Sequence, residues 1–352
     1  MCDMVTPTVG SILSNKKGSL MNEHFIKNIE IKNFKCFEDF KAEGFGRVNL
    51  IGGKNNVGKT AFMEACFFTI SVDAKSFIPF LEALISLEYF RNHEIVHEFD
   101  NLDINQYVKL LVSLLKKYID SAFFSNQNNI SIVYDNELII TINKEKYGLN
   151  DFNPLNINTE IEFSTRFITS LFIDNTQLNA LYDGVKSLRK RNEVNTFITK
   201  FDDSILEYDV IEDKPVCFSE KENRFVSLSE YGNGMKRYIA YICALWANKN
   251  GHVFIDEIEN GIHYTHLDKL WEIILKTSKQ TNCQVFATTH SKECIESYAR
   301  VAKELEEESK IKKEDIKFIK LSKKDDGTIM AGVRDYEMLQ YAIEDGHEVR
   351  GW

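Results

Sequence analysis

The sequence contains no apolar run long enough to cross a membrane. The longest one, residues 238–247, is far shorter than the roughly 18 residues that a membrane-spanning helix needs, and it is typical of a buried helix. The first twenty residues lack the charged-then-apolar pattern of a secretion signal. We therefore expect a cytoplasmic protein with no membrane contact.

Patterns typical of disulfides or zinc sites are also missing. The seven cysteines are an odd number, with no C-x-x-C pair and no regular spacing. Most of them, such as Cys66 and Cys243, fall inside apolar runs. These cysteines are expected to be small buried side chains in a reducing compartment.

A basic excess is absent as well. The 43 Lys and Arg residues face 53 Asp and Glu residues, so the formal net charge is −10. Proteins that coat DNA usually carry a basic excess, because phosphate neutralisation supplies most of their non-specific affinity. The dense basic cluster at residues 186–191 is interpreted first as a solvated helix face and second as a local nucleic-acid or partner contact. Strong autonomous DNA binding is disfavoured.

The chain of 352 residues is long enough for one large α/β domain with an insertion. We expect a disordered tail over residues 1–22 and one α/β domain over 23–352, with a helical and hairpin insertion at 77–150. The runs 253–255 and 284–287 are continuously apolar, which is typical of buried parallel strands. Further strands are predicted at 25–40 and 48–51, a helix at 77–125, a hairpin at 130–142, strands at 316–321 and 328–333, and helices at 61–68, 238–247 and 336–344.

Residues 53–60 form a complete phosphate-binding loop of the pattern G-x-x-x-x-G-K-S/T. A buried strand precedes the loop and a helix follows it, which is the context that such a loop requires. Its backbone N–H groups and the positive helix end would converge on phosphate oxygens. Lys59 would reach the β- and γ-phosphates, and Thr60 would place its hydroxyl on Mg²⁺. The sequence therefore predicts binding of a nucleoside triphosphate.

Two acidic residues follow the buried strand that begins at residue 252. Asp256 would hold Mg²⁺, and Glu257 would polarise the attacking water, a step that needs a carboxylate near the γ-phosphate. A second buried strand, at 285–287, ends in the polar residues 288–291, where His290 could sense the γ-phosphate or hold the water.

A glycine-rich segment at 228–237 precedes an apolar helix. Gly232 and Gly234 at a helix N-terminus make a second anion-binding surface. Because the phosphate loop already provides one cradle, this surface is expected to act in trans, on nucleotide held by a second copy of the chain.

The order of these motifs resembles the ATP-binding-cassette head domains of the RecF and structural-maintenance-of-chromosomes (SMC) type. Residues 231–237, 255–264 and 287–291 resemble more closely the ATPase of the overcoming-lysogenization-defect (OLD) family, which is similar to the ATPases of the Gabija and PARIS anti-phage systems. The resemblance covers about 25–75 and 220–350 and implies an α/β fold, with a mixed or parallel sheet and a helical insertion.

The resemblance implies roles for individual residues. Asp256 and Thr60 hold the metal, Glu257 is the catalytic base and His290 is the switch histidine. Glu259, Asn260 and Gly261 fall in the loop that crosses the dimer interface. The positions implied to bind ATP are Lys35, Gly53, Asn55, Asn56, Gly58, Lys59, Thr60 and Ala61, and, from the second copy, Gly232, Asn233 and Gly234.

The chain departs from these families in three places. Gly232 and Met235 stand where a transporter-type signature has serine and glutamine, which disfavours a transporter subunit. The glutamine that completes the magnesium site has one candidate, Gln177, whose alternative reading is a surface helix residue. OLD nucleases carry a TOPRIM nuclease domain after the switch histidine, and only 62 residues follow His290, so we expect an ATPase without its own nuclease.

These observations predict a Mg²⁺-dependent ATPase that dimerises around ATP, alone or within a larger assembly. It would regulate a separate effector, a TOPRIM-type nuclease or a toxin, in bacterial anti-phage defence. The alternative is a RecF-like or SMC-like repair or recombination ATPase that clamps DNA.

Overall fold

The computed structural model describes residues 24–73, 130–135, 137–142, 145–148, 165–168, 173 and 175–346. The chain divides into two compact units. The first unit comprises Met1–Ser14, Ile29–Lys41 and Ala61–Phe163, and the second comprises Asn15–Asn28, Ala42–Thr60 and Ser164–Trp352. The tail predicted at 1–22 and the helix predicted at 77–125 lie outside the described residues.

The first unit contains two small sheets and most of helix α1. Strands β1 (Asn28–Phe34) and β2 (Phe37–Glu43) pair with each other, and α1 runs over Lys59–Asp73. Phe40 packs on Phe37 and, edge-on, on Phe62 of α1. Strands β4 (Ile130–Asp135), β5 (Glu137–Ile142) and β6 (Glu145–Gly148) form an antiparallel sheet, so the hairpin predicted at 130–142 is confirmed.

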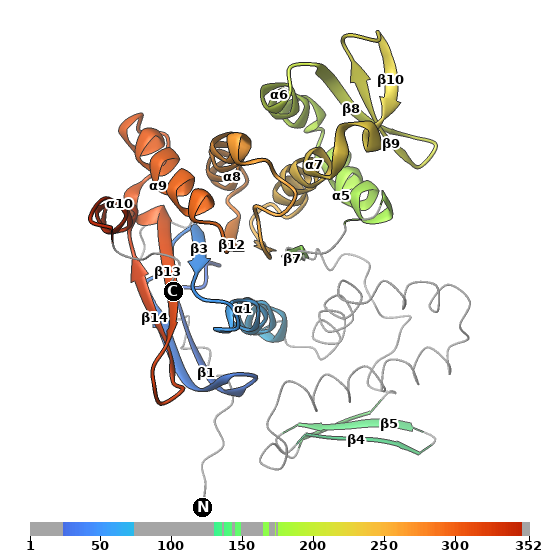
Figure 1. Cartoon of the computed structure of the whole chain (residues 1–352). Coiled ribbons are helices and arrows are strands. Elements are labelled where there is room, and N and C mark those ends of the chain that lie inside the picture. Colours follow the sequence, from blue (N-terminus) through green and yellow to red (C-terminus); the bar gives the residue numbers. More distant parts are fainter. Residues whose placement is uncertain are drawn as a thin grey trace, which may run out of the picture. The chain divides into compact units, whose positions relative to one another are not determined.

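A six-stranded sheet forms the core of the second unit (Figure 1). Its strand order is β14-β13-β3-β12-β11-β7, and the pairs from β13 to β7 are parallel while β14 is antiparallel to β13. The bounds are β3 Val48–Gly52, β7 Thr165–Ile168, β11 His252–Ile255, β12 Gln284–Thr288, β13 Ile316–Lys323 and β14 Ile329–Arg334. Every residue of β3, β11 and β12 is buried, as their continuous apolar character predicts. The predicted α/β fold with a mixed sheet is confirmed.

Helices of the second unit pack in the order α5, α7, α8, α9, α10. Figure 1 shows α7, α8 and α9 side by side along one face of the six-stranded sheet. The hydroxyl of Tyr298 on α9 donates to the carbonyls of Val48 (2.9 Å) and Lys317 (3.1 Å), which anchors that helix to β3 and β13. The bounds are α5 Asn175–Ser187, α6 Arg191–Phe201, α7 Gly232–Ala247, α8 Leu267–Thr281, α9 Lys292–Glu307 and α10 Tyr336–Glu344.

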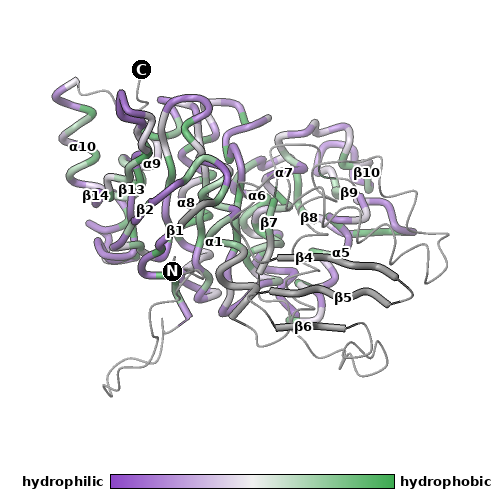
Figure 2. Tube along the Cα trace, turned by 90° about the horizontal axis from the view of Figure 1, so that it is seen from below, coloured by the Kyte–Doolittle hydropathy of each residue, from purple (hydrophilic) through white to green (hydrophobic). Residues whose placement is uncertain are grey.

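Helix α7 begins at Gly232, six residues earlier than the apolar run at 238–247 indicates. Its first three residues, Gly232, Asn233 and Gly234, are small or polar and carry no apolar signal. A 3-10 turn, η5 (Leu228–Tyr231), and a three-stranded antiparallel sheet precede the helix. That sheet comprises β8 (Ile205–Ile211), β9 (Lys214–Ser219) and β10 (Arg224–Ser227). Residues 237–246 of α7 are all buried, and Figure 2 shows green, hydrophobic stretches along this helix.

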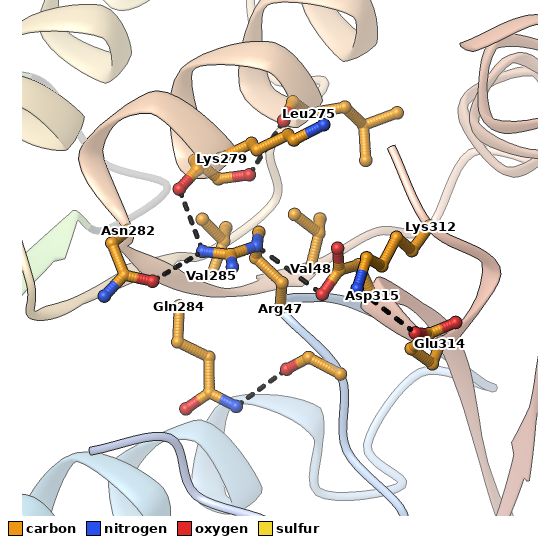
Figure 3. A network of polar contacts seen from close by, with 12 residues as sticks. Arg47, Val48, Leu275, Lys279, Asn282, Gln284, Val285, Lys312, Glu314 and Asp315 are labelled. Carbon is orange, nitrogen blue, oxygen red and sulfur yellow. Dashed lines mark hydrogen bonds and ion pairs between the residues drawn. The ribbon is translucent and has the colours of Figure 1, made fainter. Parts of the chain in front are cut away.

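Polar groups tie the amino ends of the parallel strands together (Figure 3). The Arg47 guanidinium donates to the Ser278 carbonyl (3.2 Å) and to Asn282 Oδ1 (3.1 Å), and it lies 3.6 Å from Asp315 Oδ1. Gln284, at the start of β12, donates to the carbonyls of Ile26 and Gly46. The network holds Ile26 and the strand starts in place, at the edge opposite the phosphate loop.

The described cysteines follow the expected pattern. Five of the six are buried, Cys36 is exposed, and no disulfide joins them. In the part of the chain that the structure describes, no helix is long and apolar enough to span a membrane.

Candidate active site

Three polar segments meet at the carboxyl edge of the six-stranded sheet. The phosphate loop follows β3, the two acidic residues follow β11, and the segment with His290 follows β12, which lies between those two strands. Because carboxyl ends of parallel strands share one edge, the topology brings the three segments together.

Backbone geometry explains the glycines of the phosphate loop. Gly53 and Gly58 have φ of 150° and 93°, in a region that favours glycine. A Cβ on Gly53 would lie 2.5 Å from the Leu321 carbonyl oxygen, so a side chain cannot fit. Asn55 and Asn56 are exposed at the tip of the loop, and Ala61 is buried in the first turn of α1.

Lys59 is held by the loop itself. Its ammonium donates to the carbonyls of Gly53 (2.9 Å) and Lys54 (2.8 Å). Burial lowers the pKa of Lys59, and the carboxylates of Asp256, Glu257 and Glu259 oppose that shift. The cation therefore lies inside the loop, where a phosphate group bound by the loop would meet it.

Thr60, in the first turn of α1, and Asp256, directly after β11, face each other. The Thr60 hydroxyl lies 3.2 and 3.3 Å from the two carboxylate oxygens of Asp256. Burial raises the pKa of Asp256, while hydrogen bonds from Thr288 and Thr60 lower it. These two side chains present hard oxygen donors, the ligand type that Mg²⁺ prefers.

Thr288 connects the two acidic residues. Its hydroxyl donates to Asp256 Oδ1 (2.6 Å) and accepts from the backbone N–H of Glu257 (2.8 Å). Thr288 is fully buried at the end of β12. Sequence reasoning placed this residue in a polar strand end but gave it no role, because nothing in the chain marks its pairing with a strand 32 residues away.

Glu257 and His290 form a half-exposed pair. His290 Nε2 lies 3.1 Å from Glu257 Oε1, and the side chains are 39% and 36% exposed. Glu257 has a φ of 48°, a left-handed conformation that is uncommon for a residue other than glycine. The pair is thus within reach of water, next to the Thr60–Asp256 pair.

The glycine-rich start of α7 packs against the loop that follows Glu257. A Cβ on Gly234 would lie 2.5 Å from the carbonyl oxygen of Gly261, so only glycine allows this approach. Gly232 and Asn233 are exposed at the helix start. Glu259, in the same loop, accepts hydrogen bonds from the N–H groups of His290 and Ser291, a contact that sequence reasoning missed.

The predicted roles of Lys35 and Gln177 stay predictions. Lys35 lies in the turn after β1 and pairs with the buried carboxylate of Glu64 within the first unit. The phosphate loop belongs to the second unit, and a nucleotide contact of Lys35 stays a prediction. Gln177 is half-buried in the first turn of α5, and its magnesium role also stays a prediction.

The basic cluster at 186–191 is not one helix face, because it spans the junction between α5 and α6. Three of its cations pair with carboxylates: Lys186 with Asp183, Lys190 with Glu193, and Arg191 with Asp209.

Comparisons with known proteins identify the family of the chain. Residues 48–296, which are 249 of the 352 positions, match the family described as "AAA domain, putative AbiEii toxin, Type IV TA system". An ATP/GTP phosphatase of Helicobacter pylori is 25% identical over 331 residues, covering 79% of this chain and 89% of that protein. An uncharacterised protein of Methanocaldococcus jannaschii is 23% identical over 189 residues, covering 47% of this chain and 85% of that protein.

Solved structures of low identity also align. The SMC head domain from Thermotoga maritima is 13% identical, with a TM-score of 0.43 over 87% of this chain and 97% of that one. An SMC head bound to the C-terminal winged-helix domain of ScpA is 13% identical, with a TM-score of 0.49 over 90% and 98%. The family match and the ATP/GTP phosphatase relative identify the chain as an ATP hydrolase that belongs to this AAA-domain family.

Proposed function

We propose that this ATPase works as a Mg²⁺-dependent switch in which two copies of the chain enclose two ATP molecules. The observation that carries the proposal is the convergence of Lys59, Thr60, Asp256, Glu257 and His290 at the ends of three adjacent strands. Each residue type suits one part of phosphoryl transfer to water, which depends on positioning and on charge stabilisation.

Within one copy, the phosphate loop and Lys59 bind the β- and γ-phosphates. Thr60 and Asp256 supply the oxygen ligands for Mg²⁺, which when bound neutralises charge on the phosphates. Among the described residues no cluster of three or more His, Cys, Asp or Glu side chains forms another metal site. A protein site with one carboxylate and one hydroxyl suits Mg²⁺, which keeps waters and phosphate oxygens as its other ligands.

The half-exposed Glu257 accepts a proton from the attacking water, and His290 beside it holds that water toward the γ-phosphate. As the water oxygen bonds to the γ-phosphorus, the bond from that phosphorus to the β–γ bridging oxygen breaks and ADP leaves. Lys59 stabilises the phosphate oxygens on which negative charge builds. The contact between Glu257 and His290 orients both groups for this step.

The second copy contributes the exposed start of α7. Gly232, Asn233 and Gly234 present backbone N–H groups at the positive end of a sixteen-residue helix, which suits a phosphate held by the facing copy. ATP favours the closed dimer only through contacts that the open state lacks, so hydrolysis shifts the population back to the open state.

The output that we propose is control of a separate effector chain, a nuclease or toxin, in anti-phage defence, with an OLD-like ATPase as the sensor. The support is the family description, which names an AbiEii toxin and a type IV toxin–antitoxin system. Resemblance of residues 231–237, 255–264 and 287–291 to OLD-family motifs agrees with it.

Two variants test the switch. Lys59→Ala is expected to lose ATP binding, whereas Glu257→Gln is expected to bind ATP normally, hydrolyse it at least about 100-fold more slowly and accumulate as a dimer. Calorimetry measures binding, phosphate release measures turnover, and light scattering with ATP and Mg²⁺ measures mass. Wild-type turnover in Glu257→Gln, or a monomer at saturating ATP, would contradict the proposal.

The effector is tested by affinity capture of Glu257→Gln with ATP from the native host, with Lys59→Ala as the matched control. A stoichiometric nuclease or toxin that is retained by the first variant alone supports the proposal. Recovery of nucleic acid with repair proteins supports the DNA-clamp alternative.

A further inference from the structure

The carboxylate of Glu259 binds the backbone that carries the switch histidine. Its Oε1 atom accepts hydrogen bonds from the N–H groups of His290 (2.7 Å) and Ser291 (3.0 Å). Glu259 lies in the loop after β11, and its two donors lie in the loop between β12 and α9. Hydrogen bonds to a charged acceptor are the stronger kind, so this contact restrains the position of His290.

Capping of α9 does not account for Glu259. The helix already has an N-cap, because Ser291 Oγ accepts from the N–H of Cys294 (3.1 Å). The second carboxylate oxygen of Glu259 is buried and has no hydrogen-bond partner in the part of the chain that the structure describes. A buried polar atom without a partner costs free energy, so the arrangement is not one that stability alone favours.

The same loop contacts the start of α7. Glu259 is followed two residues later by Gly261, whose carbonyl oxygen lies so close to Gly234 that a Cβ there would approach it to 2.5 Å. The N–H of Ile262 donates to the Glu259 carbonyl (2.9 Å), which makes the segment a tight turn. A displacement of the α7 start therefore pushes on a short, hydrogen-bonded turn that ends at the Glu259 carboxylate.

We propose that Glu259 is a positioning residue that couples the start of α7 to the His290–Glu257 pair of the same copy. The inference rests on the proposed function, in which the α7 start meets ATP held by the second copy. Closure of the dimer presses on the Gly234–Gly261 contact, the turn transmits the displacement, and Glu259 sets the place of His290. Hydrolysis in one copy then responds to the nucleotide of the other.

A double-mutant cycle tests this coupling. Glu259→Ala is expected to lower kcat about 10- to 100-fold, because a displacement near 1 Å at the reacting groups has effects of this size, while the ATP Kd stays within about twofold. Glu259→Gln keeps an acceptor oxygen and is expected to restore part of kcat. In a His290→Ala background, Glu259→Ala is expected to lower kcat no further, since its effect passes through His290.

Hydrogen–deuterium exchange provides a readout that needs no turnover. In Glu259→Ala the amide of His290 loses its acceptor, and the amide of Ser291 keeps only Thr289 Oγ1 (3.0 Å). The peptide that covers them is therefore expected to exchange faster than in wild type. Glu304→Ala removes an exposed carboxylate on α9 and serves as the matched control, with unchanged kcat and exchange.

The inference would be overturned if Glu259→Ala kept the wild-type kcat. It would also be overturned if the fold-losses in kcat of Glu259→Ala and His290→Ala multiplied in the double variant. Either result would leave the proposed ATPase switch intact. If wild type itself shows no rise in specific activity with protein concentration, the proposed dimer fails, and the exchange result alone reports on the Glu259 contact. Should Glu259→Ala not fold, Glu259→Gln replaces it in the same cycle.

Discussion

The hydroxyl of Thr288 donates a hydrogen bond of 2.6 Å to Asp256 Oδ1, across two neighbouring parallel strands. The hydroxyl oxygen of Thr288 also accepts a hydrogen bond from the backbone N–H of Glu257. Burial raises the pKa of Asp256, and the Thr288 bond is the largest influence that lowers it. Thr288 thereby favours the ionised form of Asp256, the carboxylate that we propose holds Mg²⁺, and fixes the backbone of Glu257, the proposed catalytic base.

Replacement of Thr288 tests this double role. Thr288→Val keeps the shape of the side chain and removes both hydrogen bonds, so we expect a loss of about 1–3 kcal/mol in the free energy of unfolding. We also expect a higher Mg²⁺ concentration for half-maximal ATPase activity and a kcat at least about tenfold lower. A Mg²⁺ titration of turnover and urea denaturation measure these effects. Thr288→Ser retains the hydroxyl and is expected to stay within about threefold of wild type.

The strands and loops of the site are largely predictable from the sequence. A buried run before a phosphate-loop pattern, and another before two acidic residues, predict strands that the structure places at Val48–Gly52 and His252–Ile255. These features depend on local pattern. The pairing of Thr288 with Asp256, and of Glu259 with the His290 backbone, depends on which strand lies next to which, and no local pattern specifies that.

Most of the features that the sequence did not predict are polar contacts between residues far apart in the chain. Arg47 binds groups more than 230 positions away, in α8 and beside it, and nothing around Arg47 in sequence marks these partners. Strand β7 has only four residues, too few for a periodic signal, although it pairs with β11 along its whole length.

Gly234 is expected to tolerate no side chain. Gly234→Ala would place a Cβ 2.5 Å from the Gly261 carbonyl oxygen, a backbone atom, so the α7 start and the loop must move apart. We expect a cost of about 1–3 kcal/mol in the free energy of unfolding and a loss of dimer-dependent ATPase activity. Gly332→Ala on β14 meets no atom within 4 Å and is the control, with unchanged turnover. Equal stability of the two variants, by thermal denaturation, would contradict this close approach.

Acid is expected to destabilise the fold through His252. Burial lowers the pKa of this histidine from 6.5 to about 4, and its Nε2 bonds the carbonyl of His24 (3.1 Å). Between these pH values His252 is protonated in the unfolded chain but neutral in the folded chain. The free energy of unfolding therefore falls as the pH drops from 6.5 toward 4. The full change is about 3 kcal/mol. His252→Gln cannot titrate, and urea denaturation at several pH values should show a shallower pH dependence for it.

The basic cluster at the α5–α6 junction is expected not to bind DNA. Lys186 lies 2.6 Å from Asp183, and Lys190 pairs with Glu193, so acidic neighbours offset two of its charges. A triple variant with serine at Lys186, Arg189 and Lys190 should keep its affinity for duplex DNA within about twofold and its salt dependence unchanged.

Fluorescence anisotropy over a range of salt concentrations measures both quantities. The control is a triple serine variant at Lys303, Lys312 and Lys324, which are exposed on other parts of the second unit. If the junction variant alone weakens binding, and the slope of log K against log salt falls by about two to three, phosphates contact this cluster. That result would favour the DNA-clamping alternative over control of an effector. Lys186 and Lys190 are paired with carboxylates, so they contribute to DNA affinity only if DNA phosphates displace those carboxylates.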